Sequence, residues 1–350
     1  MRRLCLLLAI LLLGRDAAAA PPDYPDVGPS PPLAFPRDHG AHPDFRTEWW
    51  YLTGWLKDAA GNPRGFQVTF FRSRPAVDQN NPSAFAARQI VMAHAALSDP
   101  KLGHLLHDQK VARAGFGRTH LGESGFELVL DDWTWKAGPE GGFLIRVPAD
   151  GFSLTLHVGE TQPLLLEGPE GVSSKGGGAA SRYYSLPHLA VTAEIERQGR
   201  RENLSGEAWF DHEWSSTLLP DGAVGWDWTA LDLSDGGALM AFRVRDGHET
   251  VLWSGGTWRD RDGRVEYLPA DAVRFTPRRR WLSPRSGADY PVETDLEAIL
   301  GGRKRIFSLH PLLDDQELDS RLAGGPIYWE GAVSCEAGRG YLELTGYDQR

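Results

Sequence analysis

Cysteine is almost absent from this chain of 350 residues, which contains only Cys5 and Cys335. Cys5 lies at the start of an N-terminal apolar run and is removed with it if that run is a cleaved leader. Only Cys335 then remains, so no disulfide within the mature chain is possible. The fold must therefore be held by its own core, and 350 residues are enough for two ordinary domains or one large β domain.

Long apolar segments and an excess of basic residues are missing as well. Past the first 13 residues no run is long enough to cross a bilayer, so we do not expect an integral membrane protein. The formal net charge of −10 argues against nucleic acid and anionic membrane surfaces as partners. There is no Gly-x-Ser-x-Gly motif and no phosphate-binding glycine loop, so hydrolase and nucleotide-binding functions lack support.

The first 20 residues have the pattern of a secretory signal peptide. Arg2 and Arg3 precede an apolar run over residues 4–13, and small residues follow up to Ala20. We therefore predict cleavage after Ala20 and a periplasmic or secreted protein. Residues 21–36 contain seven prolines and predict an extended arm without a core of its own.

Beyond this arm the chain is β in character. Short runs of β-branched and aromatic residues are separated by turn residues, as in GFQVTFFR (65–72) and GFSLTLHV (151–158). This spacing is typical of an all-β sandwich or barrel. The best helix signal, LLDDQELDSRLAGG, predicts a short C-terminal helical segment over 312–325. The glycine-rich segment 173–181 predicts a flexible break between two domains.

The segment RTEWWYLTGWL (46–56) carries four aromatic side chains in eleven positions. Read as a strand, it places Trp49 and Tyr51 on one face and Trp50 on the other. Both faces are bulky, so the strand is covered on both sides or lines a cavity on one. Tryptophans grouped on strands favour barrels that enclose an apolar cavity, and we predict these three residues as ligand contacts. Packing between two domains explains them equally well.

Several long motifs occur in order across residues 35–347: FPRDHGAHPDFRTEWWYLTG, AHAALSD, RYYSLPHLAVT, AWFDHEWSS, GWDWTAL, DDQEL, YWEGAV and YLELTGY. Together they resemble the AttH-like family, which also contains carotenoid 1,2-hydratases (hydroxyneurosporene synthases). The resemblance implies two tandem lipocalin-like antiparallel β-barrels, which we place at 37–176 and 177–350. Some members hydrate a terminal double bond of acyclic carotenoids, and fungal relatives are linked to cyclisations. Many bacterial members are exported proteins encoded beside ABC-transporter components.

The segment GEAWFDHEW (206–214) is the most informative for chemistry. As a strand it puts Trp209 and Asp211 on one face and Trp214 on the other. Burial beside a tryptophan inside a barrel raises a carboxyl pKa, so part of the group stays protonated near neutral pH. A protonated carboxyl can add H⁺ to an alkene, and aromatic faces can stabilise the resulting carbocation. The alternative is an ordinary half-buried strand with its carboxylates in water.

The resemblance implies that Asp211 is the acid and that Trp209 matches an aromatic residue two positions before it. The hydratases also carry a His-x-Trp pair on the preceding strand, where this chain has Tyr183 and Ser185. We therefore predict Asp211, Trp209 and Tyr183 as catalytic residues. The replacement of the His-x-Trp pair by Tyr183 and Ser185 counts against a hydratase function, but it leaves the expected fold unchanged.

Three more tryptophans complete the predicted ligand contacts. Trp214 follows Asp211 on the same strand, and Trp226 and Trp228 share one face of GWDWTALDL (225–233). Barrel packing is the alternative explanation for Trp226 and Trp228.

The segment RDHGAHPDFRTEWW brings six polar residues next to the first tryptophans: Arg37, Asp38, His39, His42, Arg46 and Glu48. His39 and His42 lie in a Gly/Pro loop without a matching downstream pair, so we predict no metal site and no cofactor. We expect Arg46 and Glu48 to form an ion pair that closes one end of a barrel.

Two functions remain open from the sequence. One is an exported enzyme that resembles carotenoid 1,2-hydratase and adds water to a terminal C=C of an isoprenoid or polyene by acid catalysis. The other is a non-catalytic periplasmic carrier that passes an apolar small molecule to or from an ABC transporter.

Overall fold

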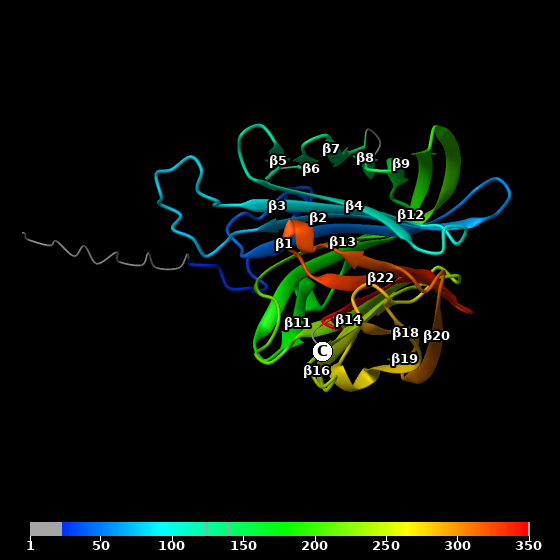
Figure 1. The fold of residues 1–350 in the computed structure, drawn as a ribbon. Coiled ribbons are helices and arrows are strands. Elements are labelled where there is room, and N and C mark those ends of the chain that lie inside the picture. Colours follow the sequence, from blue (N-terminus) through cyan, green and yellow to red (C-terminus); the bar gives the residue numbers. More distant parts are fainter. Residues whose placement is uncertain (1–22, 124, 139–140, 349–350) are drawn as a thin grey trace, which may run out of the picture.

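The computed structural model describes residues 23–348, except 124 and 139–140. The predicted signal peptide over residues 1–20 lies outside the described residues. The fold is all-β and consists of two large antiparallel sheets, one of 13 strands and one of 10, packed against each other (Figure 1). None of the helices in the described part of the chain is long and apolar enough to span a bilayer.

The first sheet uses the strands of residues 47–217. Its members are β1 (Thr47–Lys57), β2 (Pro63–Ser73), β3 (Ile90–Ser98), β4 (Leu105–Arg113), β5 (Thr119–Leu121), β6 (Glu127–Leu130), β7 (Trp133–Ala137), β8 (Phe143–Ala149), β9 (Phe152–Gly159), β10 (Leu165–Leu166), β11 (Val172–Gly176), β12 (Ala179–Arg197) and β13 (Arg200–Thr217). Their order is β4-β3-β2-β1-β13-β12-β9-β8-β7-β6-β5, with β10 and β11 also paired to β12.

The second sheet uses the remaining strands. Its members are β14 (Gly225–Leu233), β15 (Ala238–Arg245), β16 (Val251–Arg259), β17 (Val265–Leu268), β18 (Val273–Leu282), β19 (Asp289–Leu300), β20 (Arg303–Pro311), β21 (Glu317–Asp319), β22 (Ile327–Cys335) and β23 (Gly338–Thr345). Their order is β17-β16-β15-β14-β23-β22-β20-β19-β18, with β21 paired to β22. Four 3-10 turns connect strands: η1 (Arg37–His39), η2 (Pro169–Gly171), η3 (Ala270–Ala272) and η4 (Arg321–Ala323).

The strands on either side of the predicted division at 176/177 both belong to the first sheet. The glycine-rich segment is a tight hairpin in which β11 and β12 pair, with Ser173 opposite Ser181. Gly176, Gly177 and Gly178 all have positive φ there, a conformation that glycine adopts without a steric penalty. Strands β12 and β13 then return to the first sheet, and the chain enters the second sheet only after β13.

The segment 312–325, predicted as helical, is helical only in part. The segment forms the short strand β21 and the single 3-10 turn η4. Its residues Gln316 and Glu317 are buried and bonded to other elements: Ser98 Oγ donates to Gln316 Oε1 at 2.7 Å, and Ser283 Oγ to Glu317 Oε1 at 2.8 Å. These tertiary bonds and the pairing with β22 outweigh the local helix signals.

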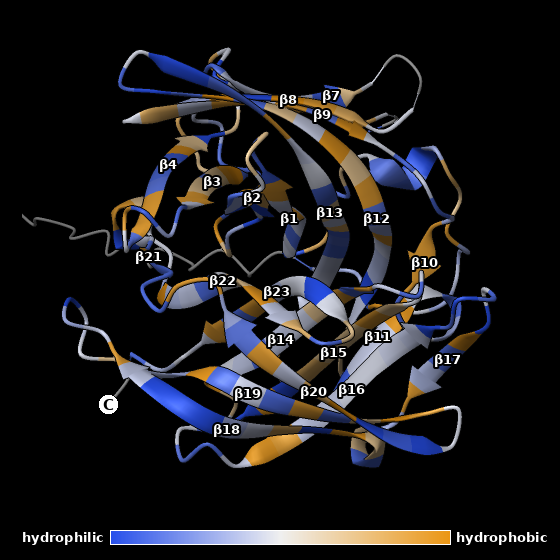
Figure 2. Cartoon of the chain, turned by 90° about the vertical axis from the view of Figure 1, so that its right-hand side faces the viewer, coloured by the Kyte–Doolittle hydropathy of each residue, from blue (hydrophilic) through white to orange (hydrophobic). Residues whose placement is uncertain are grey.

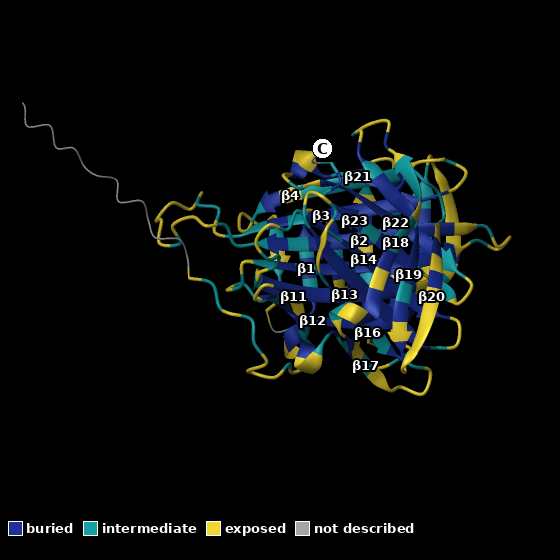
Figure 3. Cartoon of the chain, turned by 90° about the horizontal axis from the view of Figure 1, so that it is seen from below, coloured by how far each residue is buried: buried dark blue, intermediate teal, exposed yellow. Residues whose placement is uncertain are grey.

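Each sheet curves around its own apolar core, and both curved sheets are seen end-on in Figure 2. A third apolar cluster lies between the sheets and includes Tyr51, Trp209, Trp228 and Phe242. Exposed residues collect in the loops and in outer strands such as β20, whereas β1, β14 and residues 208–215 of β13 are largely buried (Figure 3). Strand β1 therefore has one face in the first core and the other toward the second sheet.

The described part of the N-terminal arm runs along the first sheet without regular structure of its own until η1. Arg182 of β12 donates to the carbonyl oxygens of Gly28 and Pro31 at 2.6 and 2.8 Å. Tyr24 Oη donates to Arg74 O at 2.8 Å. The arm is thus fixed by hydrogen bonds to side chains and backbone of the sheet rather than by a core.

Candidate functional site

A cavity of about 210 Å³, which we call the central cavity, lies between the two sheets. Strands β1, β12 and β13 form one wall, and β14, β15, β22 and β23 form the other. Its aromatic lining consists of Trp49, Tyr51, Phe71, Tyr183, Trp226, Trp228, Phe242 and Tyr328. Its charged or titratable lining consists of Lys175, Asp211, Glu213, Glu330 and Glu343. An apolar cavity with a few convergent polar groups is the usual form of a small-molecule site.

Asp211 lies in the wall of this cavity and is held by three donors. Trp209 Nε1 donates to its Oδ1 at 2.6 Å, Ser185 Oγ to the same oxygen at 2.5 Å, and Tyr183 Oη to Oδ2 at 2.7 Å. Trp228 Nε1 donates in turn to Tyr183 Oη at 3.1 Å. The Tyr183 hydroxyl therefore accepts from one sheet and donates to the carboxyl of the other.

The electrostatic state of Asp211 follows from its burial. Only 3% of the residue is exposed, and the loss of water raises its pKa to about 7. The hydrogen bonds from Ser185, Tyr183 and Trp209 favour the carboxylate and limit this rise, while the charge of Glu213 adds to it. Near neutral pH a substantial fraction of Asp211 is therefore protonated, as a general acid requires.

The opposite wall holds two neighbouring carboxyls, one buried and one half-buried. Glu330 of β22 and Glu343 of β23 are direct cross-strand partners. Burial raises the pKa of Glu343 to about 7, and burial together with the charge of Glu343 raises the pKa of Glu330 well above its ordinary value. Gln67 Nε2 donates to Glu330 Oε2 at 2.5 Å, and Trp226 Nε1 to Glu343 Oε2 at 3.0 Å.

An ion pair completes the lining. Lys175 Nζ is 3.0 Å from Glu213 Oε1 and 4.3 Å from the centre of the Phe242 ring. The ammonium group is thus paired with a carboxylate on one side and an aromatic face on the other.

The structure brings together most of the residues predicted from the sequence. Trp49, Tyr51, Tyr183, Asp211, Trp226 and Trp228 all line the central cavity. Trp209 shares the face of Asp211, as strand alternation predicts, and contacts it through its indole N–H.

Trp50 and Trp214 do not belong to the central cavity. Both are buried in the core of the first sheet, because they lie on the opposite faces of β1 and β13. Trp50 stacks on His212 with ring centres 4.8 Å apart, and Trp214 stacks on His42 at 3.7 Å. Alternation along the strands gave the two faces correctly, but it could not say which face meets the cavity.

Sequence reasoning missed Lys175, Glu213, Glu330 and Glu343 as cavity residues and Glu167 behind the cavity. Glu330 and Glu343 lie within the motifs YWEGAV and YLELTGY. A single acidic residue inside an otherwise apolar strand was a usable signal, because carboxyl groups are rarely fully buried without a partner.

The ion pair predicted between Arg46 and Glu48 is wrong. Glu48 is paired with Arg72, whose Nε lies 2.8 Å from Glu48 Oε2. Arg46 lies instead over the ring of Tyr24, with its Cζ 6.0 Å from the ring centre. Arg72 is opposite Glu48 on β2, so register decides the pairing.

His42, Glu48 and His212 form a compact buried group inside the first sheet. His42 Nδ1 and His212 Nε2 lie 2.8 and 2.9 Å from Glu48 Oε1, and Arg72 is bonded to the other carboxylate oxygen. The hydrogen bonds to Glu48 and its pairing with Arg72 hold its pKa well below its ordinary value. We interpret the group as a hydrogen-bonded structural network, since its atoms already satisfy one another.

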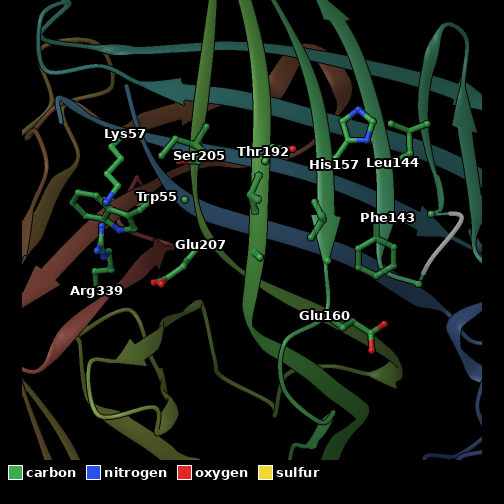
Figure 4. A pocket seen from close by; sticks show the side chains of 18 residues that line it. Trp55, Lys57, Phe143, Leu144, His157, Glu160, Thr192, Ser205, Glu207 and Arg339 are labelled. Carbon is green, nitrogen blue, oxygen red and sulfur yellow. The ribbon is translucent and has the colours of Figure 1, made fainter. Parts of the chain in front are cut away.

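A larger hollow of about 970 Å³ opens where β1 ends and β8 begins (Figure 4). Its charged lining residues, Lys57, Glu160, Glu207 and Arg339, are all exposed. Because it has no buried reactive group, we place the candidate site in the smaller central cavity.

Known proteins resemble this chain in sequence and in fold. The AttH-like family matches residues 26–347. The crystal structure of an AttH homologue from Nitrosomonas europaea is 47% identical, with a TM-score of 0.85, and the match covers 92% of this chain and 99% of that one. The structure of kievitone hydratase from Nectria haematococca is 15% identical, with a TM-score of 0.66, and the match covers 95% of this chain and 99% of that one. A search of curated proteins gave no match. Since the family match spans nearly the whole described chain, this protein belongs to the AttH-like family.

Proposed function

We propose that this protein binds an apolar, unsaturated molecule in the central cavity and adds water to a terminal C=C, with Asp211 as the general acid. The observation that carries the proposal is a buried carboxyl with a pKa of about 7 in the wall of an aromatic cavity. The fold it shares with kievitone hydratase, which is a hydratase by name, agrees with this chemistry.

The reaction has three steps. The Asp211 O–H proton adds to one alkene carbon, and the π electrons form the new C–H bond. The carbocation left on the other carbon lies among the faces of Trp49, Trp226 and Trp228, which stabilise positive charge. Water then bonds to this carbon, and the proton it releases passes to the Asp211 carboxylate, which gave up its own proton in the first step.

The size of the cavity limits what enters it. About 210 Å³ is below the roughly 300–1,000 Å³ of typical small-molecule pockets. A long polyene would therefore place only one end against Asp211, which agrees with hydration of a terminal double bond.

The test is Asp211→Asn, which keeps the shape of the side chain but has no acidic proton. Purified protein is incubated with acyclic isoprenoid alkenes, and products heavier by one water are sought by mass spectrometry. We expect turnover to fall by roughly two to four orders of magnitude in Asp211→Asn, with ligand affinity little changed. Glu207→Gln, an exposed carboxyl change on the same strand, is the matched control. Equal turnover in Asp211→Asn and wild type would reject the acid role.

A non-catalytic carrier is the second candidate. It is favoured by the three donors on Asp211, which satisfy a carboxylate as fully as a purely structural role requires. A carrier for a lipophilic molecule, working with an ABC transporter, would keep its delivery function in Asp211→Asn and lose affinity in Trp228→Ala. We further propose export of the protein, supported by the leader pattern of residues 1–20. N-terminal sequencing of the protein from its own cells tests this.

A further inference from the structure

A single hydroxyl group lies between two buried carboxyls behind the central cavity. Ser185 Oγ is 2.5 Å from Asp211 Oδ1 and 2.8 Å from Glu167 Oε1. Ser185 and Glu167 have no exposed surface, and Asp211 has almost none. A serine hydroxyl has one proton, so it donates in only one of these two bonds. The other contact is a hydrogen bond only when that carboxyl is protonated and donates to Ser185 Oγ.

The neighbouring donors decide which carboxyl holds the proton. Asp211 accepts from Trp209 at one oxygen and from Tyr183 at the other. Glu167 Oε2 has no hydrogen-bond partner among the described residues. As donors besides Ser185, Tyr183 and Trp209 both stabilise the charged form of Asp211, whereas only Thr257 does so for Glu167. The resting arrangement is therefore a protonated Glu167 that donates to Ser185, which donates to Asp211.

The electrostatics agree with this order. Burial and the charge of Asp211 raise the pKa of Glu167 to about 8, compared with about 7 for Asp211. Because the two groups interact through one hydroxyl, the apparent values belong to the pair. The other titratable or charged groups that act on this pair are Lys175, Tyr183, Glu213, Arg259, Tyr267 and Glu343.

We propose that Glu167 and Ser185 form a proton relay that reloads Asp211 after each turnover. The inference rests on the proposed acid role of Asp211. The Glu167 O–H proton moves to Ser185 Oγ while the Ser185 proton moves to Asp211 Oδ1, so one proton passes from Glu167 to Asp211 and no bond other than O–H changes. The proton that the attacking water releases passes to Asp211 and then along the same path, in reverse, to Glu167, which restores the resting arrangement.

The position of Glu167 suits a proton store rather than a substrate contact. It lies between β10 and η2, outside the lining of the cavity, and its backbone N–H donates to Tyr183 O at 3.1 Å. The same strand that carries Tyr183 and Ser185 therefore also fixes Glu167. A substrate in the cavity meets Asp211 alone, and Glu167 acts through Ser185.

The relay is tested in the intact, ligand-free protein by infrared difference spectroscopy of protonated carboxyl groups. Wild type is compared with Glu167→Gln, Ser185→Ala and Ser185→Thr, and Glu207→Gln is the control for an exposed carboxyl. We expect the wild type to show a protonated carboxyl near neutral pH that is lost in Glu167→Gln. The Asp211 signal should then titrate on its own, near pH 7. Ser185→Ala should uncouple the two titrations, and Ser185→Thr, which keeps a hydroxyl, should restore the coupling.

The pH profile of turnover supplies the second measurement. With the relay, kcat of the wild type falls only as pH rises past about 8, where Glu167 loses its proton. In Glu167→Gln we expect kcat to fall already past about pH 7, and to be lower by roughly tenfold or more, with KM unchanged. A Glu167→Gln profile that matches that of Glu207→Gln would assign Glu167 a structural role and reject the relay.

The two proposals fail in different ways. If the wild type turns over no alkene, the hydratase proposal fails, while the infrared comparison still decides whether the proton is shared. If Glu167 is ionised at neutral pH in wild type, the relay is rejected whatever the turnover.

Discussion

Glu330 and Glu343 face each other across neighbouring strands, at positions where like charges are unfavourable. Glu330 is buried and Glu343 half-buried, so ionising them together would place two negative charges side by side with little water around them. The fold instead retains protons that these groups lose in the unfolded chain. Burial likewise raises the pKa of Asp211 in the first sheet and of Glu167 behind it. Buried acids with raised pKa values make the folded state less stable as pH rises.

Glu343→Gln should stabilise the protein at high pH and not at low pH. The pKa of Glu343 is about 7 in the fold, compared with 4.5 for an ordinary glutamate. Below about pH 4.5 both states hold the proton, and the residue contributes no pH-dependent difference. As pH rises to about 7, the unfolded state alone releases the proton, so wild-type stability falls. Above that window we expect the variant to gain on the order of 3 kcal/mol over its difference at low pH.

Urea unfolding of wild type and Glu343→Gln at about pH 4.5 and about pH 8 measures this effect. Glutamine keeps an oxygen for Trp226 Nε1, so the packing is retained. Glu207→Gln, on the exposed side of β13, should show no such pH dependence. A stability difference that is the same at both pH values would contradict the prediction.

At the scale of elements, β1 and β13 determine the site because each presents one face to a core and the other to the cavity. All of β1 pairs with residues 205–215 of β13, with Tyr51 opposite Asp211 and Thr53 opposite Trp209. Gly54 allows this pairing because the backbone of β13 and the Phe66 ring of β2 both lie close to its Cα. A Cβ there would contact Phe66 Cε1 and lie 2.5 Å from the carbonyl oxygen of Glu207. The lack of a side chain at this position therefore keeps three adjacent strands in register.

Gly54→Ala should destabilise the protein by about 1–3 kcal/mol, because backbone and a packed ring must move to make room. Gly159→Ala is the matched control, since a Cβ at that strand position meets no atom within 4 Å. Urea midpoints of the two variants measure the difference. Equal midpoints would show that the first sheet adjusts at Gly54 without loss.

Alternation of residues along each strand predicted which side chains share a face, but not which strands pair with each other. The faces of Trp209 and Asp211, and those of Trp49 and Trp50, follow from period 2 alone. The neighbour of β1 does not, because β13 lies about 150 residues further along the chain and no local pattern specifies so distant a partner. For the same reason the far wall, with Glu330 and Glu343, could not be placed opposite Asp211.

At the scale of the whole molecule, the two sheets share an interface that is both apolar and hydrogen-bonded. Trp55 Nε1 of β1 donates to Gly340 O of β23 at 2.9 Å, and Ser98 Oγ of β3 bonds to Gln316. His94 Nδ1 and Tyr328 Oη, from opposite sheets, are 3.0 Å apart. Each of these groups would lose its partner if the sheets separated, and buried polar groups without partners are unfavourable.

We therefore expect the first sheet, expressed alone as residues 23–217, to be poorly soluble or to bind a hydrophobic dye strongly. Its face with Tyr51, Trp55 and Trp209 would be exposed to water as one apolar patch. Calorimetry of the whole chain should show one cooperative unfolding transition. A soluble fragment with weak dye binding, or two separate transitions in the whole chain, would show that the sheets are independent units.

The placement of the third apolar cluster has a consequence for how such proteins diversify. The first and second cores contain almost none of the residues that line the central cavity. Substitutions in the lining therefore change the chemistry of the cavity while both cores remain filled. A lineage built on this plan can exchange a histidine for a tyrosine, or one buried acid for another, with little risk to folding. New ligands and reactions can thus evolve between two unchanged scaffolds, and related chains need share no more than the scaffolds themselves.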